Sequence, residues 1–262
     1  MLACLDGVVM PVDRATVPVT DEGLLRGDGV FEVVALYDGV PYALDEHLER
    51  MARSAAGLRL EGFSTELFAA DVACVLEAAG EAAEGMLRLV ATRGGRRIVI
   101  NEPAPTHVES LALVTLADVP RRLLDDIKSL SYAANMLASR LARERGADEA
   151  LLVTPHGRVL EGPRQSFVCS LDGETLVTPP LSDHILDSIT RRRLVESGLV
   201  TERPISVDEL PFALEAFLAS TTREVHPVRS IDGVALAVTP GPLTRRAGAA
   251  LRGAVARATG SA

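Results

Sequence analysis

Strands and helices follow one another in this chain without the regular alternation that builds a parallel sheet. The first strands flank Asp6-Gly7 and Asp38-Gly39, which are dipeptides suited to the tight turns of β-hairpins. Helical spacing of apolar residues follows over 44–58 and 64–80, and strand patterns return over 85–119. Because hairpins and helices are mixed in this way, the sequence predicts an α+β fold and not a doubly wound one.

Capping residues mark the ends of the predicted helices. Asp45 is placed to cap the first long helix, whereas Ser64 begins the second helix and Gly80 ends it. Neither 27–29 nor 92–95 opens a helix after a strand, so a dinucleotide-binding fingerprint is rejected. In the second half of the chain, helices are predicted over 131–146, 189–198 and 241–258, and strands over 150–154, 158–162, 166–170, 175–180, 216–220 and 223–231.

A break in both patterns at residues 119–126 marks the predicted domain boundary. This segment, VPRRLLDD, combines a proline with a run of charges. We therefore predict a smaller N-terminal α/β domain over 1–118, an interdomain loop over 119–124 and a larger C-terminal domain over 125–262.

Composition excludes several classes of protein. The 262 residues carry a formal net charge of −9, and 47% of them are hydrophobic, so a globular fold is expected and a basic surface for nucleic acid or anionic lipid is not. The arginine runs at 96–97, 121–122 and 191–193 lack interleaved aromatic residues. The three cysteines have neither disulfide nor zinc-site spacing, and no apolar stretch approaches a bilayer span. We expect a cytoplasmic protein without a metal site.

Lysine is almost absent from the chain. The 27 basic residues comprise arginines and a single lysine, Lys128. A compositional bias that replaces lysine by arginine explains the ratio, but arginine cannot take the place of a primary amine that must lose a proton and attack a carbonyl. The count alone leaves a catalytic and an accidental Lys128 equally open.

The surroundings of Lys128 suit an amine nucleophile. The segment DDIKSLSYAANML changes there from an extended to a helical pattern, and apolar neighbours can desolvate an ammonium group. Tyr132 follows four residues later, so its hydroxyl can approach the same pocket if this stretch is helical. Taken alone, Tyr132 is better explained as a core residue with a hydrated tip.

Several motifs in order resemble the class IV aminotransferases, which are the fold-type IV pyridoxal-phosphate enzymes. The stretch from IKSLSYAANML to GRVLEG, together with SDHILDSITR and STTREVHPVRSIDG, is similar to that family, and DEGLLRGDGVFE and YALDEHLERMARSA resemble its opening segments. The resemblance covers nearly the whole chain. It implies pyridoxal 5'-phosphate as cofactor and a homodimer with the cofactor near the domain interface.

The resemblance assigns roles to three charged residues. Lys128 matches the lysine that forms a Schiff base with the cofactor and then carries the proton between substrate and cofactor. Glu161 matches the carboxylate that pairs with the pyridine nitrogen, which makes the ring an electron sink. Arg50 matches the arginine that binds the phosphate, a ligand suited to the forked donors of a guanidinium.

Hydroxyl and backbone groups complete the implied phosphate site. A helix opens at 188–190, where free backbone N–H groups attract an anion. The three arginines that follow are expected to point mostly to solvent. The implied contacts to cofactor and phosphate are Arg50, Lys128, Tyr132, Glu161, Ser188, Ile189, Thr190, Thr221 and Thr222.

The chain departs from the family pattern at two positions. Ser166 stands where the family commonly has an asparagine, five residues after the pyridine-binding glutamate, and His226 stands where it has a threonine. The family also commonly has glycine in place of Ser188. We interpret His47 and His226 as structural, since nothing arranges them as ligands or as partners of a nucleophile.

Substrate residues are indicated by aromatic content and by two arginines. The chain has no Trp, six Phe and three Tyr, which disfavours the aromatic wall of a branched-chain enzyme. Phe31 is predicted to contact the substrate. Arg26 occupies a position where relatives often carry an aromatic residue, and Arg88 alternates along its strand so that it shares a face with Val90. Two arginines in one pocket suit substrate carboxylates, although each arginine taken alone is better explained as a surface residue.

These features rank the alternatives for function. Transamination of a D-amino acid, D-glutamate or D-alanine, fits two carboxylate-binding groups and comes first. Aminodeoxychorismate lyase, whose substrate is doubly acidic, comes second, and branched-chain aminotransferase comes third. A binding or assembly protein on the same scaffold is disfavoured by the presence of Lys128, Glu161 and Arg50.

Overall fold

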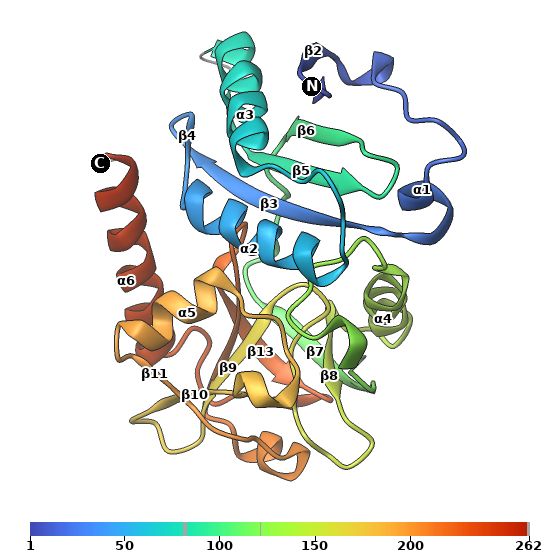
Figure 1. Cartoon of the computed structure of the whole chain (residues 1–262). Helices are drawn as coiled ribbons and strands as arrows, with labels where there is room; N and C mark the ends of the chain where they lie inside the picture. The colour runs from blue at the N-terminus through green and yellow to red at the C-terminus, as the bar shows by residue number, and fades with distance from the viewer. Residues whose placement is uncertain (81–82, 121, 261–262) are drawn as a thin grey trace. The chain divides into compact units, whose positions relative to one another are not determined.

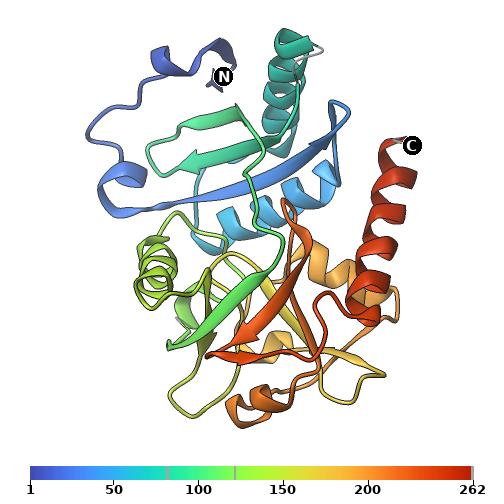
Figure 2. The same ribbon diagram turned by 180° about the vertical axis from the view of Figure 1, so that it is seen from behind.

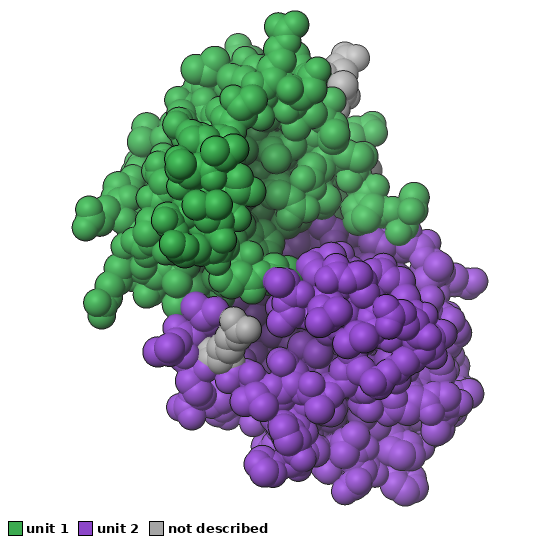
Figure 3. Space-filling view, turned by 90° about the vertical axis from the view of Figure 1, so that its right-hand side faces the viewer, with its two compact units in different colours: residues 1–106, 127–132, 255–262 green, residues 107–126, 133–254 purple. Residues whose placement is uncertain are grey.

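The chain forms two compact units, each with its own sheet and core. The computed structural model describes residues 1–80, 83–120 and 122–260, so Arg121 of the arginine pair at 121–122 lies outside the described residues. Unit 1 comprises residues 1–106, 127–132 and 255–262, and unit 2 comprises 107–126 and 133–254 (Figure 3). Unit 2 thus begins earlier than the predicted boundary at 119–126, and the segment 127–132 returns to unit 1.

Strand pairing explains this difference from the predicted domains. The strand β7 (Leu111–Ala117) was expected in the N-terminal domain, but it pairs in parallel with β8 (Glu149–Val153) and β13 (Glu224–Ile231) of unit 2. The segment 127–132 was expected in the C-terminal domain, but Ser129 bridges to Val30 of unit 1. Both placements depend on partners far along the chain, which local patterns do not reveal.

Unit 1 is built on an antiparallel sheet. Within the described residues its strand order is β2-β1-β6-β5-β3-β4 (Figures 1 and 2). The predicted hairpin turns are confirmed, because Asp6-Gly7 and Asp38-Gly39 all have positive φ, as this type of turn requires. Its elements are β1 (Leu2–Leu5), β2 (Val8–Pro11), a 3₁₀ turn (Val12–Arg14), α1 (Glu22–Arg26), β3 (Gly29–Tyr37), β4 (Val40–Pro41), α2 (Leu44–Gly57), α3 (Thr65–Ala79), β5 (Met86–Thr92) and β6 (Arg97–Glu102).

The helices of unit 1 cover its sheet. Helix α2 packs against β3, and α3 packs against β1 and β6 (Figure 1). The Ser64 hydroxyl accepts the Leu67 N–H at 3.2 Å and Gly80 ends α3, so both predicted boundaries of that helix are confirmed. Asp45, in contrast, does not cap α2. The N-cap position of this helix is Ala43, which has a left-handed conformation, and Asp45 lies inside the first turn. Its negative charge there still favours the helix start.

Unit 2 is built on a mixed sheet. Within the described residues the strand order is β11-β10-β9-β12-β13-β7-β8, and β14 pairs with β13 (Figures 1 and 2). Helix α4 packs against β7 and β8, and α5 packs against β11 and β12. Its further elements are 3₁₀ turns (Arg122–Leu124, Leu181–Asp183, Val207–Phe212), α4 (Ala133–Glu144), β9 (Ser166–Ser170), β10 (Leu176–Thr178), α5 (Ile189–Glu196), β11 (Val200–Glu202), β12 (Glu215–Ser220), β14 (Val234–Ala235) and α6 (Pro242–Thr259), whose last turns belong to unit 1.

The predicted strand over 158–162 is shorter in the structure. Val159 forms an isolated bridge with Val153, and its N–H donates to the Ile205 carbonyl. This segment therefore hydrogen-bonds to two different parts of the chain, near Val153 and near Ile205, and does not form a continuous strand. Among the helices of the described residues, none is long and apolar enough to cross a membrane.

Candidate active site

Lys128 lies beside two aromatic rings in unit 1. Its Nζ is 4.4 Å from the ring centroid of Phe31 and 5.9 Å from that of Tyr132, and the two rings meet edge to face at 5.1 Å. The Lys128 carbonyl accepts the Phe31 N–H at 3.1 Å, and the Lys128 N–H donates to the Ser54 hydroxyl at 3.1 Å. The backbone therefore fixes the segment, while the rings surround the amine.

The segment that carries Lys128 is not helical. It runs beside the start of β3, where the Leu130 N–H donates to the Gly29 carbonyl at 2.8 Å, and α4 begins only at Ala133. Lys128 and Tyr132 are therefore not related by a helical turn, which was the condition under which the sequence placed the Tyr132 hydroxyl near the same pocket. The side chains nevertheless converge, because Phe31 on the neighbouring strand lies against both.

A buried ion cluster lies behind this strand. Glu32 on β3 accepts two hydrogen bonds from Arg50 on α2, from Nε and Nη2, each at 2.7 Å. The other partner of the Glu32 carboxylate is His47 Nδ1, also at 2.7 Å. Glu32 and His47 are fully buried and Arg50 is 4% exposed. The cluster fixes the direction of the arginine that the resemblance assigns to the phosphate.

The sequence prediction included Arg50 and treated His47 as structural, but it missed Glu32. The available signal was a glutamate inside an apolar strand, GVFEVVALY, because such a charge is buried only with a partner.

Burial raises the pKa of Glu32, but the charge and hydrogen bonds of Arg50 outweigh it and lower the pKa from 4.5 to about 2. Burial lowers the pKa of His47. At neutral pH, Glu32 is thus ionised and His47 is neutral.

We predict that Glu32→Gln lowers the free energy of unfolding of the cofactor-free protein by about 3–5 kcal/mol, since the buried Arg50 charge loses its counter-ion. The matched control Glu102→Gln breaks a more exposed pair and should cost about 0–1 kcal/mol. Because the folded state lowers the Glu32 pKa, its contribution is present above pH 4.5 and is lost as the pH falls toward 2. Denaturant unfolding at pH 7 and pH 3 measures both effects, and equal losses in the two variants at pH 7 would contradict the prediction.

Glu161 lies in unit 2 against the segment that leads into α5. Its Oε1 accepts the Leu186 N–H at 3.2 Å, and its carbonyl accepts the Leu152 N–H at 2.9 Å. The carboxylate is half-buried. The segment before α5 is therefore tied directly to the residue predicted to bind a pyridine nitrogen.

The start of α5 has the predicted geometry. Ser188 is the capping residue, and its hydroxyl accepts the Arg191 N–H at 3.4 Å. Ile189 and Thr190 form the first turn and are buried. The expectation that the following arginines mostly face solvent is wrong for Arg191, which is 2% exposed and donates to the Pro179 carbonyl at 2.7 Å and to Glu202.

Thr221 and Thr222 lie at the same sheet edge as the loop that follows Glu161. Ser166 opens β9 and pairs with Ala219 near the end of β12, so the loop before β9 and the turn after β12 are neighbours. Helix α5 packs on β12. Unit 2 thus gathers the loop after Glu161, the turn with Thr221 and Thr222, and helix α5 at connected elements.

The positions that depart from the family pattern have backbone support. Ser166 Oγ and Gln165 Oε1 are buried without a hydrogen-bond partner in the described residues, so the side chain of Ser166 does not hold the loop. Instead, Asn135 on α4 donates to the Pro163 carbonyl at 2.7 Å. His226 hydrogen-bonds the Val108 carbonyl through Nε2 at 2.7 Å, which is a structural contact.

Arg26 and Arg88, predicted to bind substrate carboxylates, each have an acidic partner in unit 1. Arg26 is exposed and pairs with Glu22 one turn away on α1 at 2.7 Å. Arg88 on β5 makes two hydrogen bonds to Glu102, at 2.7 and 2.8 Å. Both guanidinium groups are therefore already paired.

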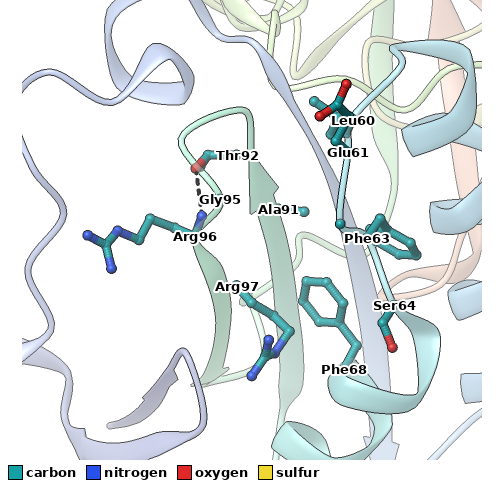
Figure 4. A pocket seen from close by; sticks show the side chains of 11 residues that line it. Leu60, Glu61, Phe63, Ser64, Phe68, Ala91, Thr92, Gly95, Arg96 and Arg97 are labelled. Carbon is teal, nitrogen blue, oxygen red and sulfur yellow. Dashed lines mark hydrogen bonds between the residues drawn. The ribbon is translucent and has the colours of Figure 1, made fainter.

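A hollow in unit 1, lined by none of the predicted site residues, lies between the connection of α2 to α3 and the hairpin of β5 and β6 (Figure 4). Phe63 and Phe68 stack there at 5.4 Å. Arg97 pairs with Asp71, and Arg96 pairs with Asp6 at 2.6 Å. The guanidinium charges beside this hollow are already neutralised, so we assign no ligand to it.

Comparison with known proteins gives the class. The family model for amino-transferase class IV matches residues 29–231. The chain therefore belongs to the class IV aminotransferases. Among solved structures, a hypothetical aminotransferase from Mycobacterium tuberculosis in its PLP-bound form is similar with a TM-score of 0.90 and 26% identity over 98% of this chain and 99% of that one. The predicted family and fold type IV are confirmed.

Curated relatives have different substrates in their names. A D-alanine aminotransferase from Bacillus licheniformis is 32% identical over 97% of both chains. A putative branched-chain-amino-acid aminotransferase from Methanocaldococcus jannaschii is 34% identical over 87% of both. A bifunctional aminodeoxychorismate lyase / D-amino acid transaminase from Mycobacterium tuberculosis is 30% identical over 92% of this chain and 94% of its own. These names agree on the class and differ on the substrate.

The cofactor of this class is pyridoxal phosphate, as predicted. The donor groups of each unit fit it chemically. Unit 1 offers the Lys128 amine for an aldehyde. Unit 2 offers the Glu161 carboxylate for a ring nitrogen, and hydroxyl and backbone N–H groups at the start of α5 for a phosphate.

Proposed function

We propose that this class IV aminotransferase moves the amino group of a D-amino acid, D-glutamate or D-alanine, to a 2-oxo acid. The observation that carries the reaction is the Lys128 amine held between Phe31 and Tyr132. The choice of a D-amino acid is supported by the similarity to a D-alanine aminotransferase over 97% of both chains.

Each predicted residue has a proposed role. When bound, pyridoxal phosphate supplies the aldehyde for the amino group and an electron-withdrawing ring. Lys128 Nζ takes the proton from the substrate Cα and returns it, while Phe31 and Tyr132 keep the amine in place. Glu161 holds a proton on the pyridine nitrogen.

The remaining residues bind anionic groups. Arg50, oriented by Glu32, and the backbone at the start of α5 bind the phosphate together with Thr221 and Thr222. Arg26 and Arg88 exchange their acidic partners for a substrate carboxylate.

We predict that D-glutamate or D-alanine alone bleaches the visible absorbance of the holoenzyme, and that 2-oxoglutarate or pyruvate restores it. The L-enantiomers should react much more slowly, because their α-carboxylate lies on the opposite side when the Cα–H bond points to Lys128. Stopped-flow absorbance with each enantiomer measures this. Faster reaction of the L-enantiomers would contradict the D-assignment.

Aminodeoxychorismate lyase is the second candidate, supported by the bifunctional relative. A lyase releases pyruvate and needs no 2-oxo acid to complete its cycle. An unchanged spectrum with every D-amino acid, together with pyruvate release from aminodeoxychorismate, would favour this candidate. Branched-chain transamination remains third, supported by the relative with that name.

A homodimer is part of the proposal. Leu24 and Leu25 on α1 are 63% and 57% exposed, and adjacent exposed leucines of this kind suit a subunit contact. Light scattering of the purified protein tests the subunit number.

A further inference from the structure

Unit 2 contains a half-buried guanidinium without a carboxylate partner. Arg223 follows Thr221 and Thr222 in the turn between β12 and β13. In the described part of the chain no acidic side chain forms an ion pair with it, and its side-chain contact is His226 Nδ1 at 3.4 Å. Because a buried charge is costly unless it is paired, this arginine calls for an anion.

The two carboxylates whose charges act on Arg223 are already engaged with other partners. Glu149, which is buried, pairs with Arg164 at 3.0 Å and accepts the Ala150 N–H. Asp148 pairs with Arg229 at 2.8 Å and accepts the Ala112 N–H at 2.7 Å. Neither is left to neutralise Arg223, so the cluster has a surplus positive charge.

A second arginine, Arg164, which pairs with Glu149, also acts on Arg223. Arg164 lies in the loop between Glu161 and β9, and the pairing of Ser166 with Ala219 brings this loop to the turn that holds Arg223. Burial and the positive charge of Arg164 lower the pKa of Arg223 below its ordinary value. The guanidinium nevertheless remains charged near neutral pH.

His226 contacts the arginine, and His107 packs against His226. His226 Nε2 donates to the Val108 carbonyl, which leaves Nδ1 to accept one N–H of Arg223. The His107 ring lies 5.5 Å from that of His226, and its Nε2 hydrogen-bonds the Thr222 carbonyl at 3.2 Å. Burial lowers the pKa of both histidines, so they are neutral at pH 7. With Nη1 held by His226, the Nε and Nη2 donors of Arg223 form a fork that matches the two oxygens of a carboxylate.

We propose that Arg223, supported by Arg164, binds the side-chain carboxylate of a dicarboxylic substrate. This inference rests on the proposed function, because it places the substrate beside the turn that carries Thr221 and Thr222. It deepens that function by assigning an acidic substrate class, a glutamate-like amino donor or its 2-oxo acid, instead of a substrate with an apolar side chain.

The test measures binding of two unreactive probes to the holoenzyme. Glutarate carries two carboxylates and butyrate carries one, and neither has an amino or oxo group. Calorimetry compares the parent protein with Arg223→Gln, Arg223→Lys and the control Arg252→Gln, which changes an exposed arginine on α6.

We expect Arg223→Gln to weaken glutarate binding by about 10- to 100-fold, as for a hydrogen bond to a charged group, and to change butyrate binding by less than about 2-fold. Arg223→Lys should give an intermediate loss, because it keeps the charge but not the fork. Arg252→Gln should match the parent protein for both probes.

Three results would overturn the assignment. These are unchanged glutarate binding in Arg223→Gln, equal weakening of both probes, and a loss of cofactor affinity with glutarate binding intact, which would give Arg223 to the phosphate. If Arg223→Gln fails to fold, the comparison of glutarate and butyrate binding in Arg223→Lys tests the assignment instead. A glutarate-selective loss in a protein that transaminates no D-amino acid would remove the proposed function and keep the carboxylate site.

Discussion

Lys128→Ala abolishes amino-group transfer and leaves the protein folded, because no other lysine exists in the chain and arginine cannot act as the nucleophile. The fold should persist, since the hydrogen bonds of Lys128 to Phe31 and Ser54 use its backbone. Turnover and circular dichroism of the variant test both parts. Lys128→Arg, which keeps the charge, should be equally inactive.

A covalent label checks the same assignment independently of turnover. Borohydride reduction of the holoenzyme followed by peptide mapping should place the cofactor on Lys128. A label found on the N-terminal amine alone, or an active Lys128→Ala variant, would contradict the role of this residue.

Glu161→Gln should still bind the cofactor but slow removal of the substrate Cα proton by orders of magnitude. A neutral amide can keep the hydrogen bond from the Leu186 N–H, but it cannot offset the positive charge of a protonated pyridine ring. The exchange of the Cα proton for deuterium, followed by NMR, measures that step separately from product release.

The control for Glu161→Gln is Glu174→Gln, an exposed glutamate in the same unit. It changes the net charge by the same amount and should exchange the Cα proton at the parent rate. Full exchange activity in Glu161→Gln would assign the pyridine nitrogen to another group.

Local features of the fold could be predicted from the sequence. Asp-Gly turns and the caps Ser64 and Gly80 depend on residues close together in the chain, and the structure confirms them. The family motifs supplied the class and the cofactor in the same way, because they are short and ordered.

Features that depend on distant partners could not be predicted. The cluster of Glu32, His47 and Arg50 requires a strand and a helix to meet, and the sequence alone gave no reason to group these three residues. Likewise, the placement of β7 depends on parallel pairing with β8 and β13, which no local period encodes.

Substrate residues show the same division. Arg26 and Arg88 were recognised from their positions in motifs, but their pairs with Glu22 and Glu102 are visible only in the structure. Arg223 stood inside a recognised motif without a role, because the lack of an acidic partner is a three-dimensional property.

The return of residues 127–132 to unit 1 constrains how such a chain can be made and recombined. During synthesis the residues of the unit 1 sheet are added before the segment that carries Lys128, so a chain that ends at residue 106 has the strands of this sheet but lacks the amine. A gene chimera joined at that point would combine the sheet of one parent with the lysine segment of another. A crossover that keeps the unit 1 sheet and the Lys128 segment from the same parent must lie beyond Tyr132.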